Sequence, residues 1–394
     1  MAQIKKSLLV TLAFPPQVGG EQAFYYNVCK NLPPDKIVVL APQHKNAEEF
    51  DRRQNFTIIR KNLLNLFPEN SPKNLSGLLK VAGSVRWMSL IKDFNLIAKS
   101  HGVELIQAGQ ILPIGTLALL HKKRKKTPYI FYAHGLDITL PQNFRRKKIL
   151  LKKIIAEAFA IVANSHFTKD ELVKLGAEPG KILVVHPCPN LIGQEPSEYE
   201  KEEIIKNHNL TCKKIILTVG RLVERKGHDM VIKSLPKIIK ALPEVVYLIV
   251  GDGPDRPRLA QLVNRLNLKN YVKFIGPVSA KNLPAYFDLA DVFIMPSRQL
   301  PNGDVEGFGI VFIEANLFGK PVIGGRSGGV PEAVINGKTG LLVNPHDVED
   351  IAEKTITLLT NQALAAKLGL QGLERAAEEF NWQDQTEKIK EILK

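Results

Sequence analysis

The chain has 394 residues, more than a single hydrophobic core usually organises, so we expect two domains. Hydrophobic residues make up 44% and charged residues 24%, which is ordinary for a soluble globular protein. The three cysteines are far apart and form no Cys-x-x-Cys pair, which argues against a disulfide framework or a zinc site and favours a reducing, cytosolic compartment.

The net charge of +15 is confined to the first half of the chain. Residues 1–190 contain 28 Lys and Arg against 13 Asp and Glu, whereas residues 191–394 contain 26 of each kind. Such an asymmetry points to a polyanionic partner for the first half: a membrane surface, a phosphorylated acceptor or nucleic acid.

The N-terminal sequence MAQIKKSLLVTLAFPP has two lysines before an apolar run, as a signal peptide would. The run is short and ends in Pro-Pro without a small-residue cleavage site, and QVGGEQAFYYNVCKNL follows as a glycine loop that opens a helix. We therefore interpret the run as a buried first strand. No uninterrupted apolar run reaches transmembrane length; residues 105–120 come nearest and are broken by Gln, Gly and Pro.

Short runs rich in Val, Ile, Leu and Phe alternate with helical patterns along the chain, which is typical of parallel strands covered on both faces. The first half contains SLLVTLAF, KIVVLAP, FTIIR, VELIQAG, YIFYAH, AIVANS and ILVVHP, and the second half contains KIILTVGR, VVYLIVGDG, YVKFIGPV, VFIMPS, PVIGG and GLLVNP. We predict two doubly wound α/β domains of Rossmann type, with ligands at the carboxyl ends of the strands, in a cleft between the domains.

We expect the domain boundary near residues 190–210. Residues 186–203, HPCPNLIGQEPSEYEKEE, combine prolines with an acidic, polar run, which is typical of a linker or domain edge. We place the first domain at 1–195 and the second at 196–375.

Two glycine-containing loops of the second half are candidates for ligand binding. The strand KIILTVG continues into Arg221 and LVERKG, so Arg221 and Lys226 share a loop ahead of a helix that begins near Gly227. Two cations beside a helix N-terminus favour a pyrophosphate, although two solvated surface cations would be the simpler interpretation of this loop alone. A second strand ends in VGDGP, where Gly251 would allow a ligand close to the backbone; ordinary strand-to-helix turns look the same.

The stretch DVEGFGIVFIEA places Glu306 and Glu314 on either side of a Gly-Phe-Gly turn. The second glycine is expected to open a helix that carries Glu314 on its second turn. Backbone N–H groups of residues 307–309 can donate to hydroxyls and phosphate, and the carboxylates can accept hydrogen bonds from hydroxyls on two different rings. Each glutamate alone is more simply a surface charge; together with Arg221 and Lys226 the pair indicates a binding site.

The second half resembles the retaining nucleotide-sugar glycosyltransferases of family 4, also called group 1, which have the GT-B fold. The resemblance is carried by four stretches as a set: GRLVERKG, VGDGP, the EGFG stretch with its second glutamate, and GGVPEAVINGKTGLLV. Three further stretches resemble that family's glycine loop, catalytic-histidine loop and closing helix: FPPQVGG (14–20), YAHGLD (132–137) and FNWQDQTEKIKEIL, respectively. The closing helix, at 376–394, would pack back toward the N-terminal, acceptor-side domain. DVEGFGIVFIEA and FPPQVGG are especially similar to the phosphatidylinositol mannoside mannosyltransferases, which use GDP-mannose.

The resemblance implies a role for each matching residue. Arg221 and Lys226 would hold the donor diphosphate, Glu314 the ribose and Glu306 the sugar, and His134 would lie under the transferred sugar near its C6 hydroxyl. Relatives often have an acidic residue a few positions after that histidine, and Asp137 is the candidate here. The expected catalytic residues are His134, Glu306, Arg221 and Lys226, and the expected donor-binding residues also include Gly19, Gly20, Gly251, Ile275, Gly276, Gly307, Phe308, Gly309, Ile310 and Glu314.

The implied chemistry is transfer of a hexose, with mannose from GDP-mannose as the best guess, to a lipid-linked or polyol acceptor. Fixed cations and a helix N-terminus would stabilise the leaving diphosphate without a metal or other cofactor, which agrees with the lack of an Asp-x-Asp motif in the sequence. The alternatives are a UDP-sugar-dependent glycosyltransferase with a soluble acceptor, a sugar-nucleotide epimerase, and a basic nucleic-acid-binding protein. Against nucleic acid, aromatic residues are not interleaved with the basic runs.

Basic residues of the first half lie in two runs, KKRKK at 122–126 and RRKKILLKKIIAEAF at 145–159. The second run predicts an amphipathic helix, whose apolar residues Ile149, Leu150, Ile154, Ile155 and Phe159 would pack on the sheet or face a membrane. We expect a cytoplasmic protein whose basic surface makes peripheral contact with the anionic inner face of the membrane, although clustered lysines also serve solubility alone.

Overall fold

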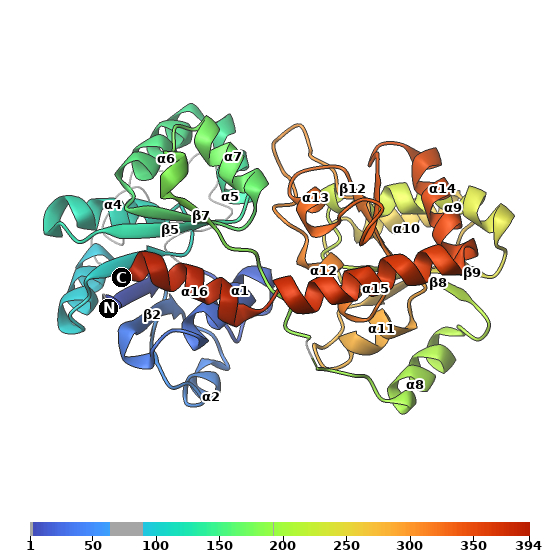
Figure 1. The fold of residues 1–394 in the computed structure, drawn as a ribbon, viewed down its shortest axis with the longest axis horizontal. Coiled ribbons are helices and arrows are strands. Elements are labelled where there is room, and N and C mark those ends of the chain that lie inside the picture. Colours follow the sequence, from blue (N-terminus) through green and yellow to red (C-terminus); the bar gives the residue numbers. More distant parts are fainter. Residues whose placement is uncertain (1–2, 64–89, 192) are drawn as a thin grey trace. The chain divides into compact units, whose positions relative to one another are not determined.

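The computed structural model describes residues 3–63, 90–191 and 193–394, and the chain divides into two compact units (Figure 1). The first unit comprises Met1–His186 and Trp382–Lys394, and the second comprises Pro187–Asn381. The chain thus passes from the first unit to the second after His186, earlier than the expected 195/196 boundary. It returns to the first unit after Asn381, later than the expected 375/376 boundary, because helix α15 (Gln362–Glu379) stays in the second unit and only α16 (Trp382–Leu393) joins the first.

The sheet of the first unit is parallel throughout, with strand order β3-β2-β1-β4-β5-β6-β7. The strand order changes direction between β1 and β4, so the loops that follow these two neighbouring strands run to opposite faces of the sheet. In α/β sheets, ligands bind at the carboxyl ends of the strands at such a point. The strands are β1 (Ser7–Val10), β2 (Ile37–Pro42), β3 (Thr57–Lys61), β4 (Leu105–Ala108), β5 (Tyr129–Ala133), β6 (Ala160–Ala163) and β7 (Ile182–Val184).

Helices cover both faces of this sheet, because alternate strand residues are apolar on both sides. One face, with Leu8 and Val10 of β1, packs against residues of α4 (Ile114–Lys125) and α6 (Arg145–Glu157). The other face, with Leu9, packs against α1 (Gly20–Lys30) and the returning α16 (Figure 1). The unit also contains α2 (Ala47–Asp51), a helical segment at residues 90–100, α5 (Leu136–Thr139) and α7 (His166–Lys174).

The second unit repeats this architecture with a parallel sheet of order β10-β9-β8-β11-β12-β13. Its strands are β8 (Lys214–Val219), β9 (Val245–Val250), β10 (Val272–Gly276), β11 (Val292–Met295), β12 (Val322–Gly325) and β13 (Gly340–Val343). Its helices are α8 (Glu198–His208), α9 (His228–Ala241), α10 (Arg256–Arg265), α11 (Leu283–Leu289), α12 (Ile310–Leu317), α13 (Val330–Ala333), α14 (Val348–Thr360) and α15.

The predicted pair of doubly wound α/β domains is confirmed, and every apolar run named in the sequence contains a strand. The predicted linker is wrong in its acidic part, since residues 198–203 are the first turns of α8. Ser197 and Glu200 form a capping box at its start, with the Glu200 N–H donating to Ser197 Oγ at 3.3 Å and the Ser197 N–H donating to Glu200 Oε2 at 3.0 Å. The Ser-x-x-Glu spacing was the sequence signal for this helix.

Candidate active site

The loop between β8 and α9 in the second unit carries the predicted diphosphate-binding cations. Residues Glu224–Lys226 form one 3₁₀ turn, and Gly227, in the left-handed region at φ 76°, precedes the first residue of α9. A Cβ at Gly227 would lie 2.2 Å from the carbonyl oxygen of Pro296, so only glycine fits there. This tight approach holds Lys226, which is 8% exposed, while Arg221 stays exposed.

The loop between β11 and α12 carries the two glutamates. Gly309, at φ 96°, caps α12, and Glu314 lies on the second turn of that helix, as the sequence predicts. The Gly329 N–H donates to the Glu306 carbonyl at 2.9 Å, and a Cβ at Gly329 would lie 2.0 Å from the Gly307 oxygen. The Phe308 side chain is buried, with its ring centroid 5.7 Å from that of Phe380, which anchors the middle of the turn.

An ion pair joins these two loops. Lys226 Nζ donates to Glu306 Oε2 at 2.5 Å, and Arg225 approaches the same carboxylate at 3.9 Å and Asp304 at 3.3 Å. The structure therefore brings Lys226 and Glu306 into direct contact, and the arginine beside them is Arg225 rather than Arg221. Sequence reasoning did not single out Arg225 and Asp304, although each is within two positions of a residue that it did.

The two glutamates differ in charge state. Burial by itself would raise the pKa of Glu306, but the Lys226 and Arg225 charges and the Lys226 hydrogen bond lower it overall. Burial raises the pKa of Glu314 to about 7, with Lys226 opposing the rise. Glu306 is thus a fixed acceptor, whereas Glu314 can either accept or donate a hydrogen bond near neutral pH.

A buried arginine holds the loop of Lys226 in place. Arg298 places Nη1 at 3.0 Å and Nη2 at 3.2 Å from the two carboxylate oxygens of Asp229, in the first turn of α9. Its backbone N–H donates to the Arg225 carbonyl at 2.8 Å. Arg298 and Asp229 are 6% and 4% exposed, so they form a buried ion pair directly behind the site. Neither residue carries a local motif that would have revealed it.

The β9 and β10 loops lie at the same sheet edge. The Gly251 N–H donates to the Gly276 carbonyl at 2.8 Å, so this N–H is occupied within the protein and does not face a ligand. A Cβ at Gly251 would lie 2.1 Å from the Gly220 oxygen, which explains the glycine by packing. Beside Ile275, a cavity of about 710 Å³ extends between α8 and α11, but the site cations and glutamates do not line it.

His134, Gly19 and Gly20 belong to the first unit. Gly19 and Gly20 open α1 as expected, and a Cβ at Gly20 would meet nothing within 4 Å, so its surroundings are open. His134 follows β5, and its backbone N–H donates to Asp137 Oδ1 at 2.8 Å. Burial raises the pKa of Asp137 to about 6, with the His134 side chain opposing the rise and Glu21 adding to it.

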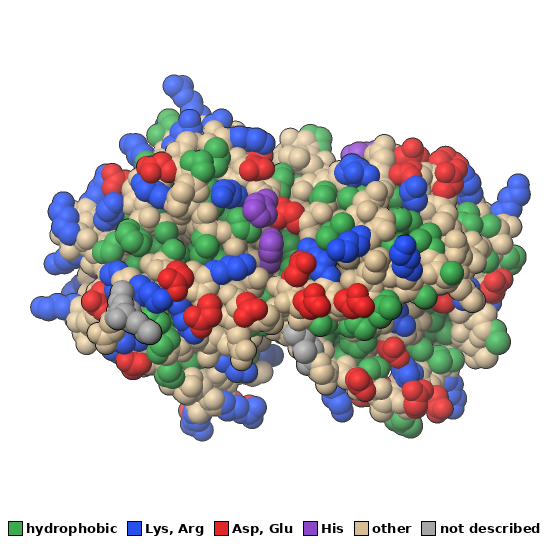
Figure 2. Space-filling view, in the orientation of Figure 1, with side chains coloured by type: hydrophobic (Ala, Val, Ile, Leu, Met, Phe, Trp, Pro, Cys, Tyr) green, Lys and Arg blue, Asp and Glu red, His purple; other side chains and the backbone are tan. Residues whose placement is uncertain are grey.

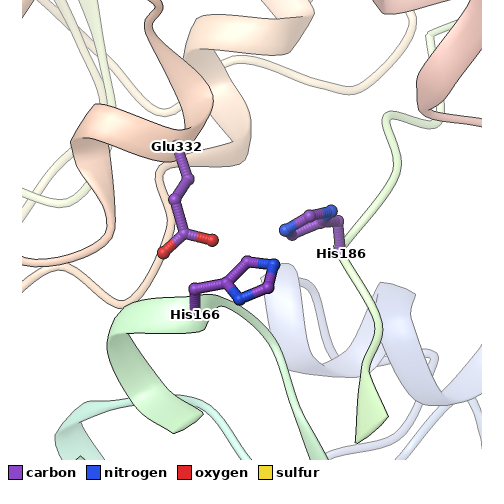
Figure 3. Close-up of side chains that lie close together, drawn as sticks. All are labelled: His166, His186 and Glu332. Atoms are coloured by element: carbon purple, nitrogen blue, oxygen red, sulfur yellow. The ribbon is translucent and has the colours of Figure 1, made fainter. Parts of the chain in front are cut away.

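Two further histidines of the first unit, His166 and His186, have ring centroids 6.2 Å apart (Figure 3). The backbone N–H of His186 donates to Gln385 Oε1 at 3.1 Å. Glu332, also drawn in Figure 3, lies on α13 of the second unit. Because two imidazoles supply fewer ligands than a zinc site normally uses, we assign no metal to the first unit on their account.

Comparison with protein families identifies both halves of the chain. The family described as "Glycosyltransferase Family 4" matches residues 18–191, and "Glycosyl transferases group 1" matches residues 200–375. The GDP-mannose-dependent alpha-(1-6)-phosphatidylinositol monomannoside mannosyltransferase of Mycolicibacterium smegmatis is 29% identical, over 98% of this chain and 97% of its own. A related mannosyltransferase of Corynebacterium glutamicum, acting on a monoacylated form of that substrate, is 29% identical over 100% and 99%.

Solved structures agree on the fold. HepE of Anabaena, crystallised with UDP and glucose, superposes with a TM-score of 0.79 at 21% identity over 99% of both chains. Sucrose-phosphate synthase of Thermosynechococcus elongatus gives a TM-score of 0.77 at 23% identity over 97% of this chain and 96% of its own.

The family matches and the fold define a glycosyltransferase of the GT-B class that acts on nucleotide sugars. The chain belongs to the group 1, family 4 glycosyltransferases, as its sequence motifs predict.

We expect Arg298→Ala to destabilise the second unit by about 3 kcal/mol, because it leaves the buried Asp229 carboxylate without its main partner. Arg265→Ala, at the exposed end of α10, is the matched control and should change stability by less than about 0.5 kcal/mol. Urea denaturation measures both. Equal stability of the two variants would contradict the bracing role of Arg298.

We expect Glu314→Gln to make folding stability less sensitive to pH. The pKa of the Glu314 carboxyl is 4.5 in the unfolded chain and about 7 in the folded protein. Its contribution to folding stability is therefore fully present below pH 4.5 and is lost as the pH rises through about 7. The loss is at most about 3 kcal/mol. Urea denaturation of the ligand-free protein at pH 5 and pH 8 should therefore show a larger decrease for wild type than for the variant. The same decrease in both proteins would refute the raised pKa.

Proposed function

We propose that the protein is a retaining, metal-independent mannosyltransferase that uses GDP-mannose and a lipid-linked or polyol acceptor. The observation that carries the proposal is the buried Lys226, fixed at the start of α9 by its ion pair with Glu306. Mannose and GDP are supported by the GDP-mannose-dependent mannosyltransferases that match the full length of the chain.

The charge of Lys226 suits a diphosphate leaving group. When the bond between the sugar C1 and the phosphate oxygen breaks, negative charge develops on the β-phosphate and oxocarbenium character on the sugar. Lys226, the exposed Arg221 and the N–H groups at the start of α12 can stabilise that negative charge without a metal ion. The acceptor oxygen would bond to C1 on the face from which the diphosphate departs, and the departing phosphate would take the acceptor's proton.

The two glutamates suit the neutral part of the donor. Glu306 is ionised and already oriented by Lys226, so it can accept hydrogen bonds from sugar hydroxyls next to the diphosphate. Glu314, one turn into α12, would bind the ribose hydroxyls, and ionisation in the complex would lower its raised pKa. The two proposed roles are consistent with the opposite pKa shifts of Glu306 and Glu314.

We expect Lys226→Ala to lower transfer about a hundredfold, since loss of one fixed donor to a developing anion costs about 3 kcal/mol. Release of GDP from GDP-mannose, and of UDP from UDP-glucose, measures the effect with wild type and variant. Lys240→Ala, exposed in the last turn of α9, is the control and should behave as wild type.

Activity of Lys226→Ala within a few-fold of wild type would reject the proposed site, provided that circular dichroism shows both variants folded. Turnover of UDP-glucose with no turnover of GDP-mannose would replace the proposed donor.

The basic surface of the first unit supports the lipid-acceptor part of the proposal. Helices α4 and α6 pack against each other, and Lys and Arg side chains gather over them (Figure 2). In α6, Leu151, Ile154 and Ile155 are buried in the core, whereas Ile149 is 49% exposed. Phe144, just before α6, is 54% exposed, and Phe159, just after it, is 50% exposed. The predicted apolar stripe thus divides between the core and an exposed rim among the basic residues.

No helix among the described residues is both long and apolar enough to cross a bilayer. Exposed aromatic and aliphatic groups next to cations are suited to the surface of an anionic membrane instead. Each basic residue near such a surface contributes roughly 1 kcal/mol, so the four consecutive basic residues at 145–148 would suffice for reversible binding.

We expect the protein to sediment with phosphatidylserine-containing liposomes at low salt, but not with neutral liposomes, and to be released as salt is raised. Changing residues 145–148 to Gln should weaken this binding while leaving GDP binding unchanged. The control changes four exposed lysines of the second unit to Gln: Lys206, Lys213, Lys240 and Lys269. Equal sedimentation of both variants, or of wild type with neutral liposomes, would contradict the membrane contact.

A further inference from the structure

The first unit has a polar cluster at the point where its sheet changes direction. Strands β1, β4 and β5 are neighbours, and their carboxyl ends are followed by Thr11, Gly109 and His134. Tyr25, from the second turn of α1, reaches this edge and is fully buried. Its hydroxyl contacts both the Gly109 carbonyl and His134.

The hydrogen bonds of Tyr25 fix the protonation of the His134 ring. The Tyr25 hydroxyl donates its single hydrogen to the Gly109 carbonyl oxygen. In its 2.7 Å contact with His134 Nε2 the Tyr25 oxygen must therefore accept, so Nε2 carries the hydrogen. Burial raises the pKa of Tyr25 well above its usual value, with Glu21 adding to the rise, so the hydroxyl keeps its hydrogen. In the neutral ring, Nδ1 is then left with its lone pair.

Packing keeps the ring in this orientation. The Phe24 ring stands edge-on to the His134 ring, with centroids 5.3 Å apart at 84°, and Tyr25 lies 5.5 Å away at 79°. The backbone of His134 is fixed at both ends, since its N–H donates to Asp137 and its carbonyl accepts from Asn164 at 3.2 Å. Rotating the ring to exchange its nitrogens would break the contact with Tyr25.

We propose that Tyr25 is a positioning residue that holds His134 as the Nε2–H tautomer, so that Nδ1 accepts a hydrogen bond from a substrate hydroxyl. The proposal rests on the proposed function for the nature of the substrate. The hydroxyl belongs either to the transferred sugar or to the acceptor. A phosphate or carboxylate, which has no hydrogen to donate, is disfavoured beside the bare nitrogen.

Nitrogen NMR measures the tautomer directly and does not depend on catalysis. With ¹⁵N-labelled histidine, wild type should show a protonated Nε2 and a bare Nδ1 for His134, assigned by its loss in His134→Gln. Tyr25→Phe keeps the ring packing and removes the hydroxyl, so it should give a mixture of tautomers. Tyr26→Phe removes a neighbouring hydroxyl from a ring that packs on Phe14 and Phe50, and it should leave the His134 spectrum unchanged.

The activity of paired variants tests which ring nitrogen of His134 forms the hydrogen bond with the substrate. An Asn amide reaches the place of Nδ1 and a Gln amide that of Nε2, so His134→Asn should keep more transferase activity than His134→Gln. Tyr25→Phe should lower kcat roughly tenfold, the effect of one lost hydrogen bond, in a protein that circular dichroism shows to be folded. Its melting temperature should fall as well, because the buried Gly109 carbonyl loses its donor. If the hydroxyl belongs to the sugar, hydrolysis of GDP-mannose without acceptor falls equally; if it belongs to the acceptor, only transfer falls.

The outcomes separate this inference from the proposed function. A wild type that turns over no nucleotide sugar defeats the proposed function, while the NMR result still decides the role of Tyr25. For a wild type that does turn over GDP-mannose, methyl α-mannoside and GDP-mannose serve as NMR probes, and either should shift the Nδ1 resonance. An Nδ1–H tautomer in wild type, an unchanged tautomer in Tyr25→Phe, or no shift with either probe in such an active enzyme would overturn the inference.

Discussion

The second unit depends on a buried cation that is neutralised by a carboxylate from another loop. Lys226 and Glu306 are 80 positions apart in sequence and 2.5 Å apart in the fold, with side chains 10% and 14% exposed. Burying either charge alone would cost several kcal/mol, so each keeps the other ionised and in place. The pair therefore presents a positive charge and an oriented carboxylate side by side, which matches the charged and neutral parts of a nucleotide sugar.

The remaining features of the site follow from holding that pair at the carboxyl edge of the sheet. Gly227 brings the start of α9 against the Pro296 carbonyl, and Gly309 turns the second loop into α12. Arg298 ties the backbone of Arg225 to the first turn of α9 through Asp229. Since each of these contacts is within the second unit, the proposed donor site is organised there. The first unit has a separate polar cluster of His134 and its hydrogen-bonded tyrosine.

Most of the architecture could be predicted from sequence, because parallel strands buried on both faces are continuous apolar runs and glycines mark the loops that follow them. The start of α12 after Gly309 and of α9 after Gly227 had the same local signal. The partners of the site residues could not be predicted, since Arg298 and Tyr25 act through contacts with residues distant in sequence and have no motif of their own. The start of α8 was missed although its capping box is local, because prolines and acidic residues favoured a linker.

Calorimetry of GDP and GDP-mannose binding to wild type and to Glu306→Gln tests most directly whether Lys226 is shared between Glu306 and the donor. In this account the diphosphate competes with Glu306 for Lys226, and the sugar hydroxyls bind to Glu306 itself. The variant should therefore bind GDP as tightly as wild type or more tightly, and GDP-mannose roughly tenfold more weakly, the effect of about 1.4 kcal/mol of lost hydrogen bonding. Equal weakening of both ligands would contradict the account, as would unchanged binding of GDP-mannose.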